Sequence, residues 1–350
     1  MKGMVLIMKK FLISEEGKFY KACLHTHTTY SDGKWTPEEL KKAYMEKGYS
    51  IVAFTDHNIF IPHLELASDD FLPLSGFEAD ISENNLWGLQ KPWQQTKTCH
   101  ICFVAMRPDI VKHPLWHRTR YNVGNMPLYK DQQQFDENQP DYLRCYCPEC
   151  INDMIKRGVE AGFFVTYNHP RWSMETAEQY LKYEGMHAME IYNHTSYLGG
   201  FPEYNDAVYD EMLRSGKKLY CISTDDAHSA SRAFGGYVMI KAKELEYCTI
   251  MDALVRGDFY ASRGPEIKSL WFDDTDNTIH VECSDAAQVI LSTAQRRHER
   301  ILPEEGKDCI NHAVLHVRET DGYVRVSVFD SKGLTADTNA YYVEDLLQNS

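Results

Sequence analysis

The chain has no long apolar stretch, and its longest apolar runs are far shorter than the about 20 residues that a membrane-spanning helix needs. It also lacks a recognisable cleavable leader, because the first segment, MKGMVLIMKKFLISEEGK, contains only a short apolar run and no small-residue cleavage site. We therefore expect the ten cysteines to be reduced. The expected protein is cytoplasmic and has no membrane partner.

Positive charge is also scarce. The 37 Lys and Arg residues are outnumbered by 51 Asp and Glu residues, which gives a formal net charge of −14 at pH 7. A nonspecific nucleic-acid clamp depends on Lys and Arg side chains that neutralise phosphates, so this composition argues against one. The sequence contains neither a GxSxG nucleophile elbow nor a Walker-type phosphate loop, so neither kind of chemistry is expected.

Seven short apolar stretches carry metal-seeking side chains at or near one end. Buried parallel strands are continuous apolar runs, and when helices alternate with them the side chains at the strand ends converge on one face of a barrel or sheet. Histidine, aspartate and glutamate gathered in this way predict a metal site. In chain order the stretches are KACLHTHTTYSD, SIVAFTDHN, FLPLSGFEAD, TCHICFVAM, GFFVTYNHP, AMEIYNH and LYCISTDDAH.

The spacing of the histidines supports a metal site. His25 and His27 are two residues apart, so on a strand both side chains project to the same side and can hold one ion. Asp226 and His228 repeat this spacing in the last stretch, and His57 ends the second stretch. These five residues are the strongest ligand candidates that spacing and position indicate.

Other polar residues of the stretches are predicted to support the site. Asp56 directly precedes the histidine of TDHN and should point the other way along the strand, as a carboxylate behind the ligands. His169 precedes Pro170, whose ring favours an extended conformation at the preceding residue and hence a strand end. Glu190 and Asn193, in MEIYNH, are equally compatible with substrate contact and with a capped strand end.

Three segments between the stretches are predicted to be helices. In TPEELKKAYMEKG, Thr36 is a plausible N-cap, Pro37 takes the first helical position and Gly48 ends the helix. The other two segments are CPECINDMIKRGVEAG and PEYNDAVYDEMLRSGKK, each followed directly by an apolar stretch. Such alternation is typical of βαβ units.

Two regions depart from this pattern. Residues from about 103 to 148 are rich in Pro, Asn, Gln and aromatics without a regular period, and their tryptophan and tyrosines favour an ordered, lid-like insertion over disorder. From about residue 266 the segments IKSLWFD, TIHVECS, AQVILSTA, AVLHVRE and YVRVSVFD alternate with turns. This pattern predicts an antiparallel β-sandwich-like domain at 266–350, without a metal site.

The motifs LHTHTTYSDG, AFTDHN, GFEAD, NHP and STDDAHS, in this order over residues 20 to 235, resemble the successive motifs of the PHP (polymerase and histidinol phosphatase) superfamily. The resemblance implies an α/β fold for residues 1–265, a distorted seven-stranded β/α barrel. It also implies two to three divalent ions, with zinc, manganese and iron all compatible with such ligands.

Nine side chains match the ligand positions of that family. The resemblance assigns His25, His27, Glu78 and Asp226 to one ion, Glu78, His100 and His169 to a second, and Asp32, His57 and His228 to a third. Glu78 would bridge two ions, and together with Asp226 it would hold a metal-bridging hydroxide. His100 begins its apolar run, as in the family pattern, and His113 and His117 in the insertion are alternatives to it.

The residues expected to bind substrate are Arg171, Arg232, Arg263 and His194, which follow strand-end motifs. Arginines there could clamp an anionic substrate through paired hydrogen bonds. The predicted function is therefore that of a metal-dependent phosphoesterase in which a metal-bridging hydroxide attacks a small phosphorylated molecule.

Two other functions stay open. The segment IMDALVRGDFYASRGPEI, after DAHSASRAFGGYVMI, resembles the tail of the carbamate-ester hydrolase branch of the superfamily. Hydrolysis of a carbamate or carboxylic ester on the same metals would favour an apolar pocket, for which Trp116, Tyr121 and Trp172 are candidates. The other alternative is a non-catalytic, metal-stabilised module, which is disfavoured because no ligand position is vacant.

The cysteines Cys145, Cys147 and Cys150 form one cluster, RCYCPEC, and Cys99 and Cys102 in TCHIC could add a second pair. Their spacing is compatible with a structural zinc ion. Ordinary buried or surface thiols are the favoured interpretation, because TCHIC lies in an apolar run and CPEC has no second knuckle in sequence.

Overall fold

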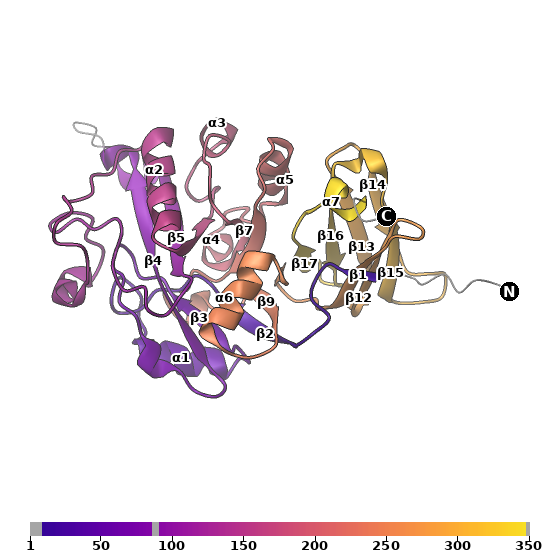
Figure 1. The fold of residues 1–350 in the computed structure, drawn as a ribbon, viewed down its shortest axis with the longest axis horizontal. Helices are drawn as coiled ribbons and strands as arrows, with labels where there is room; N and C mark the ends of the chain where they lie inside the picture. Colours follow the sequence, from indigo (N-terminus) through magenta and orange to yellow (C-terminus); the bar gives the residue numbers. More distant parts are fainter. Residues whose placement is uncertain (1–8, 86–90, 348–350) are drawn as a thin grey trace.

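The computed structural model describes residues 9–85 and 91–347, so the first eight residues of the segment considered for a leader lie outside it. The described chain forms an α/β lobe and a smaller β-rich lobe (Figure 1). None of the helices within the described ranges is both long enough and apolar enough to cross a membrane.

The α/β lobe is built on strands that are hydrogen-bonded to one another in chain order: β2 (Lys18–Cys23), β3 (Ile51–Phe54), β4 (Leu72–Ser82), β5 (Thr98–Ala105), β6 (Phe163–Tyr167), β7 (Ala188–Asn193) and β8 (Tyr220–Thr224). Every residue of β3, β6 and β7 is buried, as expected for apolar runs covered on both faces. The segments after β8 and β2 also lie side by side, because Asp226 N–H donates to His25 O at 3.0 Å and His27 N–H to Ala227 O at 3.1 Å.

The sheet of this lobe is mixed rather than all parallel. β4 pairs in parallel with β3, but β4–β5 and β5–β6 are antiparallel. No α-helix lies between β4 and β5 in the described residues, so no crossover brings β5 into the parallel direction. Because β5 runs the opposite way, its beginning meets the ends of its parallel neighbours, and for that reason His100 begins its run.

The three predicted helices are confirmed as α1 (Pro37–Met45), α2 (Pro148–Glu160) and α5 (Asp206–Arg214). The Thr36 side chain accepts a hydrogen bond from Glu39 N–H, and the Glu39 side chain bonds back to the cap backbone, so α1 starts with a full capping box. In α2, Gly158 packs directly on the Phe103 ring, where an added Cβ would come within 2.3 Å. The remaining helices are α3 (Ala177–Tyr180), α4 (His194–Leu198), α6 (Tyr247–Arg256) and α7 (Val343–Leu347).

The insertion between β5 and α2 has two short 3-10 turns, η4 (Met126–Leu128) and η5 (Lys130–Gln132), and its Trp116 and Met126 form a small core with Ile59 of the loop after β3. It packs on the loop after β2, where Asn125 N–H donates to Ser31 O at 2.7 Å. Gly124 has φ +52° and lies so close to Ser31 O that a Cβ would come within 2.2 Å, so a side chain there would push the insertion away.

The β-rich lobe consists of two antiparallel layers that share one core. The first layer has the order β1 (Lys9–Phe11), β11 (Ile267–Asp273), β12 (Thr278–Ala286), β15 (Ile310–His316). The second contains β14 (His298–Ile301), β13 (Gln288–Thr293), β16 (Tyr323–Phe329) and β17 (Thr335–Thr338), with β18 (Tyr341–Tyr342) paired to β16. The five segments expected to be strands are confirmed as β11, β12, β13, β15 and β16.

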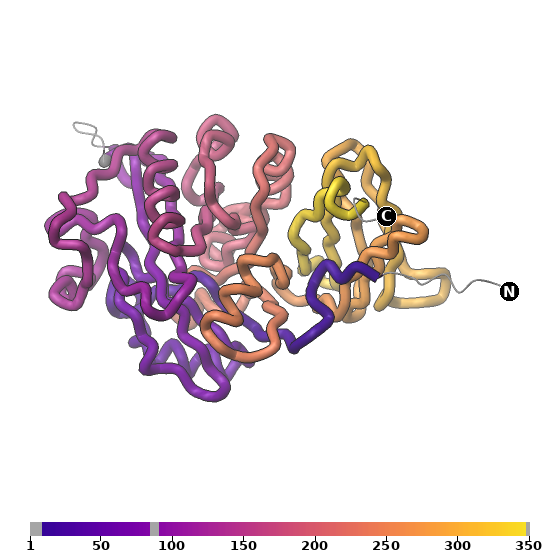
Figure 2. The backbone as a smooth tube through the Cα atoms, in the orientation of Figure 1, coloured from indigo at the N-terminus to yellow at the C-terminus, as the bar shows by residue number. Residues whose placement is uncertain are grey.

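The two lobes share a continuous sheet. β17 pairs with β10 (Phe259–Ser262), β10 with β9 (Tyr237–Ala242), and β9 with β2, so the second layer of the β-rich lobe continues into the α/β lobe. The N-terminal strand β1 lies in the β-rich lobe, and the indigo tube in Figure 2 then crosses to β2.

A buried ion pair also connects the lobes. The Arg325 guanidinium on β16 donates from Nε to Oδ1 of Asp210 on α5 at 2.9 Å and from Nη2 to Oδ2 at 3.0 Å, and Tyr323 O–H donates to the same carboxylate. Arg325 is 3% and Asp210 8% exposed, so the pair is almost fully removed from water. Hydrogen bonds on both oxygens compensate for that burial.

We predict that Asp210→Ala lowers the free energy of unfolding by about 3–5 kcal/mol, because it removes both hydrogen-bonded carboxylate oxygens from the buried Arg325 guanidinium and leaves, among the described residues, only Asp337, at 4.0 Å, as a charged partner. Urea unfolding followed by circular dichroism measures the change. The control is Glu160→Ala, which removes an exposed partner of Lys156 and should change the free energy of unfolding by no more than about 0.5 kcal/mol. Equal, small effects of the two substitutions would contradict the assignment of Asp210 as a tie between the lobes.

Candidate metal centre

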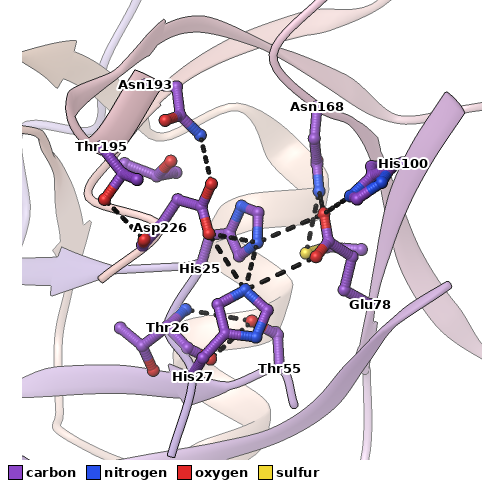
Figure 3. Close-up of polar contacts among 12 residues, drawn as sticks. His25, Thr26, His27, Thr55, Glu78, His100, Asn168, Asn193, Thr195 and Asp226 are labelled. Atoms are coloured by element: carbon purple, nitrogen blue, oxygen red, sulfur yellow. Dashed lines mark hydrogen bonds and ion pairs between the residues drawn. The ribbon is translucent and has the colours of Figure 1, made fainter. Parts of the chain in front are cut away.

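Glu78, on β4, lies among the predicted ligands, and Figure 3 shows its carboxylate beside His25, His27 and His100. The carboxylate is 1% exposed and is surrounded by imidazole rings from several strand ends. Its Oε1 lies 3.1 Å from His100 Nδ1, 3.3 Å from His169 Nε2 and 3.4 Å from His25 Nε2. The other oxygen, Oε2, lies 3.1 Å from His57 Nδ1 and 3.5 Å from His27 Nε2.

Asp226, which follows β8, faces the same histidines from the opposite side. Its Oδ1 lies 3.0 Å from His27 Nε2 and 3.3 Å from His25 Nε2, while the two Nε2 atoms are 3.1 Å apart. Asn193, at the end of β7, donates from Nδ2 to Oδ2 of Asp226 at 3.2 Å. The first predicted group is therefore assembled with two carboxylates and two imidazoles facing one point.

The third predicted group lies next to it. Asp32 Oδ1 is 3.4 Å from His228 Nε2 and 3.9 Å from His57 Nε2. The His27 ring stacks between the other two histidines, with ring centroids 4.3 Å from His57 and 4.2 Å from His228. The structure thus brings the nine sequence-predicted ligands into one cluster.

The two alternatives to His100 lie elsewhere. His113 packs on the Phe77 ring at a centroid distance of 4.0 Å, and its Nδ1 accepts the N–H of Leu115. His117 faces Asp141 at 3.5 Å within the insertion. Neither imidazole approaches Glu78.

Residues behind the cluster hold its members in place. Glu190, fully buried on β7, receives the Nδ1–H of His25 at 2.7 Å, which turns His25 Nε2 toward the cluster. Asn168 donates from Nδ2 to Oε1 of Glu78 at 3.0 Å. The predicted supporting role of Asp56 has a clear geometry: its carboxylate accepts Thr28 N–H, Thr28 O–H and Ser31 O–H, each at 2.7 Å, and so shapes the loop that leads to Asp32.

Sequence reasoning missed Asn168 and Arg144. Asn168 could have been found, since it directly precedes His169 in the NHP motif. Arg144, from the insertion, is 4% exposed and donates from Nη1 to Asn58 Oδ1 at 2.5 Å and to Asp80 O at 2.6 Å. It anchors the insertion to the residue after His57, a contact that no local pattern indicates.

Strained backbone occurs at the ligand positions. His169 has φ +26°, Asp226 φ +52° and Asn58 φ +59°, all in the left-handed region that side chains other than glycine rarely adopt. The expectation that Pro170 holds His169 extended is wrong. Instead, the His169 N–H donates to the buried Glu190 carboxylate at 2.9 Å, which stabilises the unusual conformation.

Neighbouring groups of opposite charge keep Glu78 and His169 ionised although both are buried. Burial opposes charge on His169, but its hydrogen bond to Glu78 and the charge of Asp226 raise the pKa of His169 to about 9. Burial likewise opposes charge on Glu78, but His25 and the other nearby imidazoles hold the pKa of that carboxyl well below its ordinary value. By contrast, burial and neighbouring imidazoles lower the pKa of His27 to about 4. The carboxylates therefore require positive charge, from protons on imidazoles or from cations in their place.

Three buried polar atoms of the cluster form no hydrogen bond within the described ranges, as is expected of side chains that could hold metal ions. Among the described residues, Glu78 Oε2, His57 Nδ1 and His27 Nδ1 are buried and have no hydrogen-bond partner. Four sets of donor atoms lie within 4.8 Å of one another: His27, Asp32, His57 and His228; His25, His27 and Asp226; His25, Glu78 and Cys102; and His57, Glu78 and His100. Such nitrogen and oxygen donors suit zinc, manganese or iron.

The predicted substrate residues are in different states. Arg263 is engaged with the β-rich lobe, donating from Nε to Thr335 Oγ1 at 3.1 Å, and its guanidinium lies over the Tyr192 ring. Arg232 donates from Nη1 to Thr195 O at 2.8 Å. His194 pairs through Nδ1 with Tyr192 O–H at 2.8 Å. The exposed Arg171 side chain forms no hydrogen bond or ion pair with the described residues.

The cysteines do not assemble a second metal site in the described chain. Cys99 and Cys102 are fully buried in β5, and Cys102 Sγ accepts the Asn168 amide at 3.1 Å. In the part of the chain that the structure covers, none of the close donor sets includes Cys145, Cys147 or Cys150.

The sequence model of the PHP domain matches residues 24–256. This range contains all nine clustered ligands and most of the α/β lobe. The chain therefore belongs to the PHP domain family. No curated protein matches the chain in sequence.

Solved structures match the chain at low identity. A two-domain protein from Bacteroides vulgatus containing a predicted PHP-like metal-dependent phosphoesterase is 15% identical, with 94% of this chain and 98% of that chain covered and a TM-score of 0.44. An amidohydrolase from Chromobacterium violaceum with bound sulfate and no metal is 16% identical, with 68% of this chain and 96% of that chain covered and a TM-score of 0.40. A lesion-specific endonuclease from Pyrococcus furiosus is 12% identical, with 68% of this chain and 56% of that chain covered and a TM-score of 0.39. The family assignment depends on the PHP match and not on these structures.

We predict that the purified protein binds about two to three divalent ions per chain and that a His25→Ala, His27→Ala double variant loses at least one of them. Both imidazoles face the point where Glu78 and Asp226 converge. Elemental analysis of folded protein, checked by circular dichroism, measures the content.

The control for this experiment is a second neighbouring histidine pair. His280 and His312 lie 3.4 Å apart in the β-rich lobe, far from any close set of donors that includes a carboxylate. A His280→Ala, His312→Ala variant should retain the wild-type metal content. Identical metal content in wild type and both double variants would refute the assignment of His25 and His27 as ligands.

Proposed function

We propose that the protein is a metal-dependent hydrolase, a phosphoesterase that acts on a small phosphorylated substrate. The observation that carries the proposal is the buried Glu78 carboxylate, which has one unpartnered oxygen and is surrounded by imidazoles. A carboxylate in this position is costly without cations. We further propose two to three zinc, manganese or iron ions, held in the three groups described above.

The side chains would divide the work as follows. Glu78 and Asp226, on opposite sides of His25 and His27, would accept hydrogen bonds from the attacking water and orient it. Glu190 and Asn193 would keep His25 and Asp226 aligned through the contacts described above. When bound, divalent ions would lower the pKa of a water to about 7 and neutralise oxygens on the attacked centre.

Arg171 is the best candidate among the arginines to meet the anionic group. It lies in the turn that follows His169, and its guanidinium is exposed and free of hydrogen bonds within the described chain. Arg232 and Arg263 already donate to backbone and side-chain oxygens, so they would have to exchange partners. His194, from α4, is the remaining proposed substrate contact.

The second candidate function is hydrolysis of a carbamate or carboxylic ester on the same ligands. Its support is the tail resemblance, which in the structure corresponds to α6, β9 and β10. These elements connect the lobes and lie in the sheet that joins them. A tetrahedral intermediate at carbon would use the same charges as one at phosphorus, so substrate tests must decide.

We also propose a division of the chain into two domains. Residues 1–265 would form a PHP metal-hydrolase barrel, with β2 to β8 as its seven strands and the insertion near 103–148 as a lid beside the metal centre. Residues 266–350 would form the β-sandwich-like domain. The pairing of β1 with β11 is the exception to this division.

We predict that Asp226→Asn and Glu78→Gln each lower the turnover number for hydrolysis of an aryl phosphate by more than about two decades, because each removes negative charge without removing volume. Steady-state kinetics of protein reconstituted with zinc, manganese or iron checks this. Glu178→Gln, at an exposed position on α3, is the matched control and should keep wild-type turnover. Near-wild-type turnover of either site variant would remove that residue from the proposed site.

We also predict that Arg171→Ala lowers catalytic efficiency on a phosphomonoester roughly tenfold and hardly changes that on a neutral aryl ester, because only the phosphate offers a full charge to the guanidinium. The measurement is the pair of efficiency ratios, with Arg300→Ala in the β-rich lobe as the exposed control. The ester hydrolase would move ahead of the phosphoesterase if Arg171→Ala spared the phosphoester and the neutral ester were the better substrate.

A further inference from the structure

A cavity of about 330 Å³ lies beside the metal centre. Its walls come from η3 (Trp93–Gln95), from the start of β5, from the turn after β6 and from the segment after α4. Thr98 and other uncharged polar residues complete the lining. The large side chains that line it are Trp93, His100, Trp172, Met174 and Phe201.

The cavity and the metal centre share a wall. His100 lines the cavity, while its Nδ1 faces Glu78 at 3.1 Å. The Trp172 indole packs edge-on against two ligand rings, with centroid distances of 5.1 Å to His100 and 5.0 Å to His169. A group in the cavity would therefore lie next to the rings that surround the reacting centre.

The buried Glu203 carboxylate fixes the backbone at Trp172. Its backbone N–H donates to Oε2 of Glu203 at 2.9 Å, and the Arg171 N–H donates to Oε1 of the same carboxylate at 3.2 Å. Glu203 is fully buried and also accepts the Asn205 amide at 2.8 Å. The turn that presents the indole is thus held by a buried hydrogen-bond network, which suits a preformed binding wall.

The chemistry of the lining selects an uncharged occupant. Among the described residues that line the cavity there is no Lys, Arg, Asp or Glu, and the ionisable side chain among them, His100, is turned toward Glu78. Trp93 is 68% exposed, and Met174 and Phe201 are each 36% exposed. Three large apolar side chains left open to solvent around one cavity gain more from a flat apolar ligand than from water.

We propose that this cavity binds an uncharged aromatic group of the substrate, whose ester is presented on the His100 side. The volume agrees with this class, because a cavity of about 150 Å³ already holds benzene. The space here therefore suits a bicyclic ring or a single ring with a short linker. The proposal rests on the proposed hydrolase function and adds the substrate class to it.

The test uses 1-naphthol, a neutral aromatic probe that has no bond to hydrolyse, titrated into the purified protein by isothermal calorimetry. Wild-type protein should bind one equivalent at the cavity. Trp93→Ala and Phe201→Ala should weaken binding at least tenfold, since each removes an aromatic wall without touching a metal ligand. Leu128→Ala, which removes an exposed apolar side chain of the insertion, should leave binding unchanged.

A kinetic arm separates this proposal from the proposed function. Trp93→Ala should raise the KM for 1-naphthyl phosphate at least tenfold while leaving the turnover of methyl phosphate unchanged. If no phosphoester is hydrolysed but 1-naphthol binding follows the variant pattern, the cavity proposal stands and the phosphoesterase function falls. Absence of 1-naphthol binding, or equal binding by wild type, Trp93→Ala and Phe201→Ala, overturns the cavity proposal whatever the activity.

Discussion

The buried carboxylate of Glu78 is the constraint on which the rest of the site depends. Removing such a charge from water costs several kcal/mol, and the chain offsets it with imidazoles rather than with Lys or Arg. An imidazole can lose its proton and bind a metal ion in the place of that proton, whereas a guanidinium stays protonated. This choice of partner makes the centre suited to exchangeable ions. The left-handed backbone at His169 and Asp226 is tolerated because hydrogen bonds of these residues with Glu190 and Asn193 hold both of them in the cluster.

Much of this centre could be predicted because its ligands occur at the ends of apolar runs. The spacing of His25 with His27 and of Asp226 with His228 needs only local geometry, and the order of the motifs supplied the other ligand positions. What could not be predicted depends on pairing between distant strands. The role of Glu190 follows from which strand ends face each other, and that of Arg144 from how the insertion folds back on the loop after β3, and neither has a local pattern. The antiparallel direction of β5 is a similar case, because an apolar run does not itself show whether its strand runs parallel or antiparallel to its neighbour.

The relation between the lobes was likewise beyond local patterns. Alternating segments predicted the strands of the β-rich lobe, but period-two alternation gives a strand no information about its partner. β17 pairs with β10 and so continues the sheet of the α/β lobe, and the N-terminal β1 completes the other layer. With Arg325 and Asp210 buried between them, the lobes share both a sheet and an ion pair. The β-rich lobe is therefore tied to the α/β lobe by backbone pairing as well as by side chains.

The polar centre and the apolar cavity meet at one side chain, His100. One nitrogen of this ring faces Glu78, and the ring itself forms part of the cavity wall beside Trp172. With the proposed substrate, the charged atoms and the apolar part would be recognised by separate sets of residues, since the predicted metal ligands come from strand ends while Trp93, Met174 and Phe201 come from connecting segments. Connecting segments tolerate change better than strand ends do. Exchange of these apolar side chains could therefore alter substrate preference while Glu78 and its imidazoles, and with them the reaction itself, stay the same.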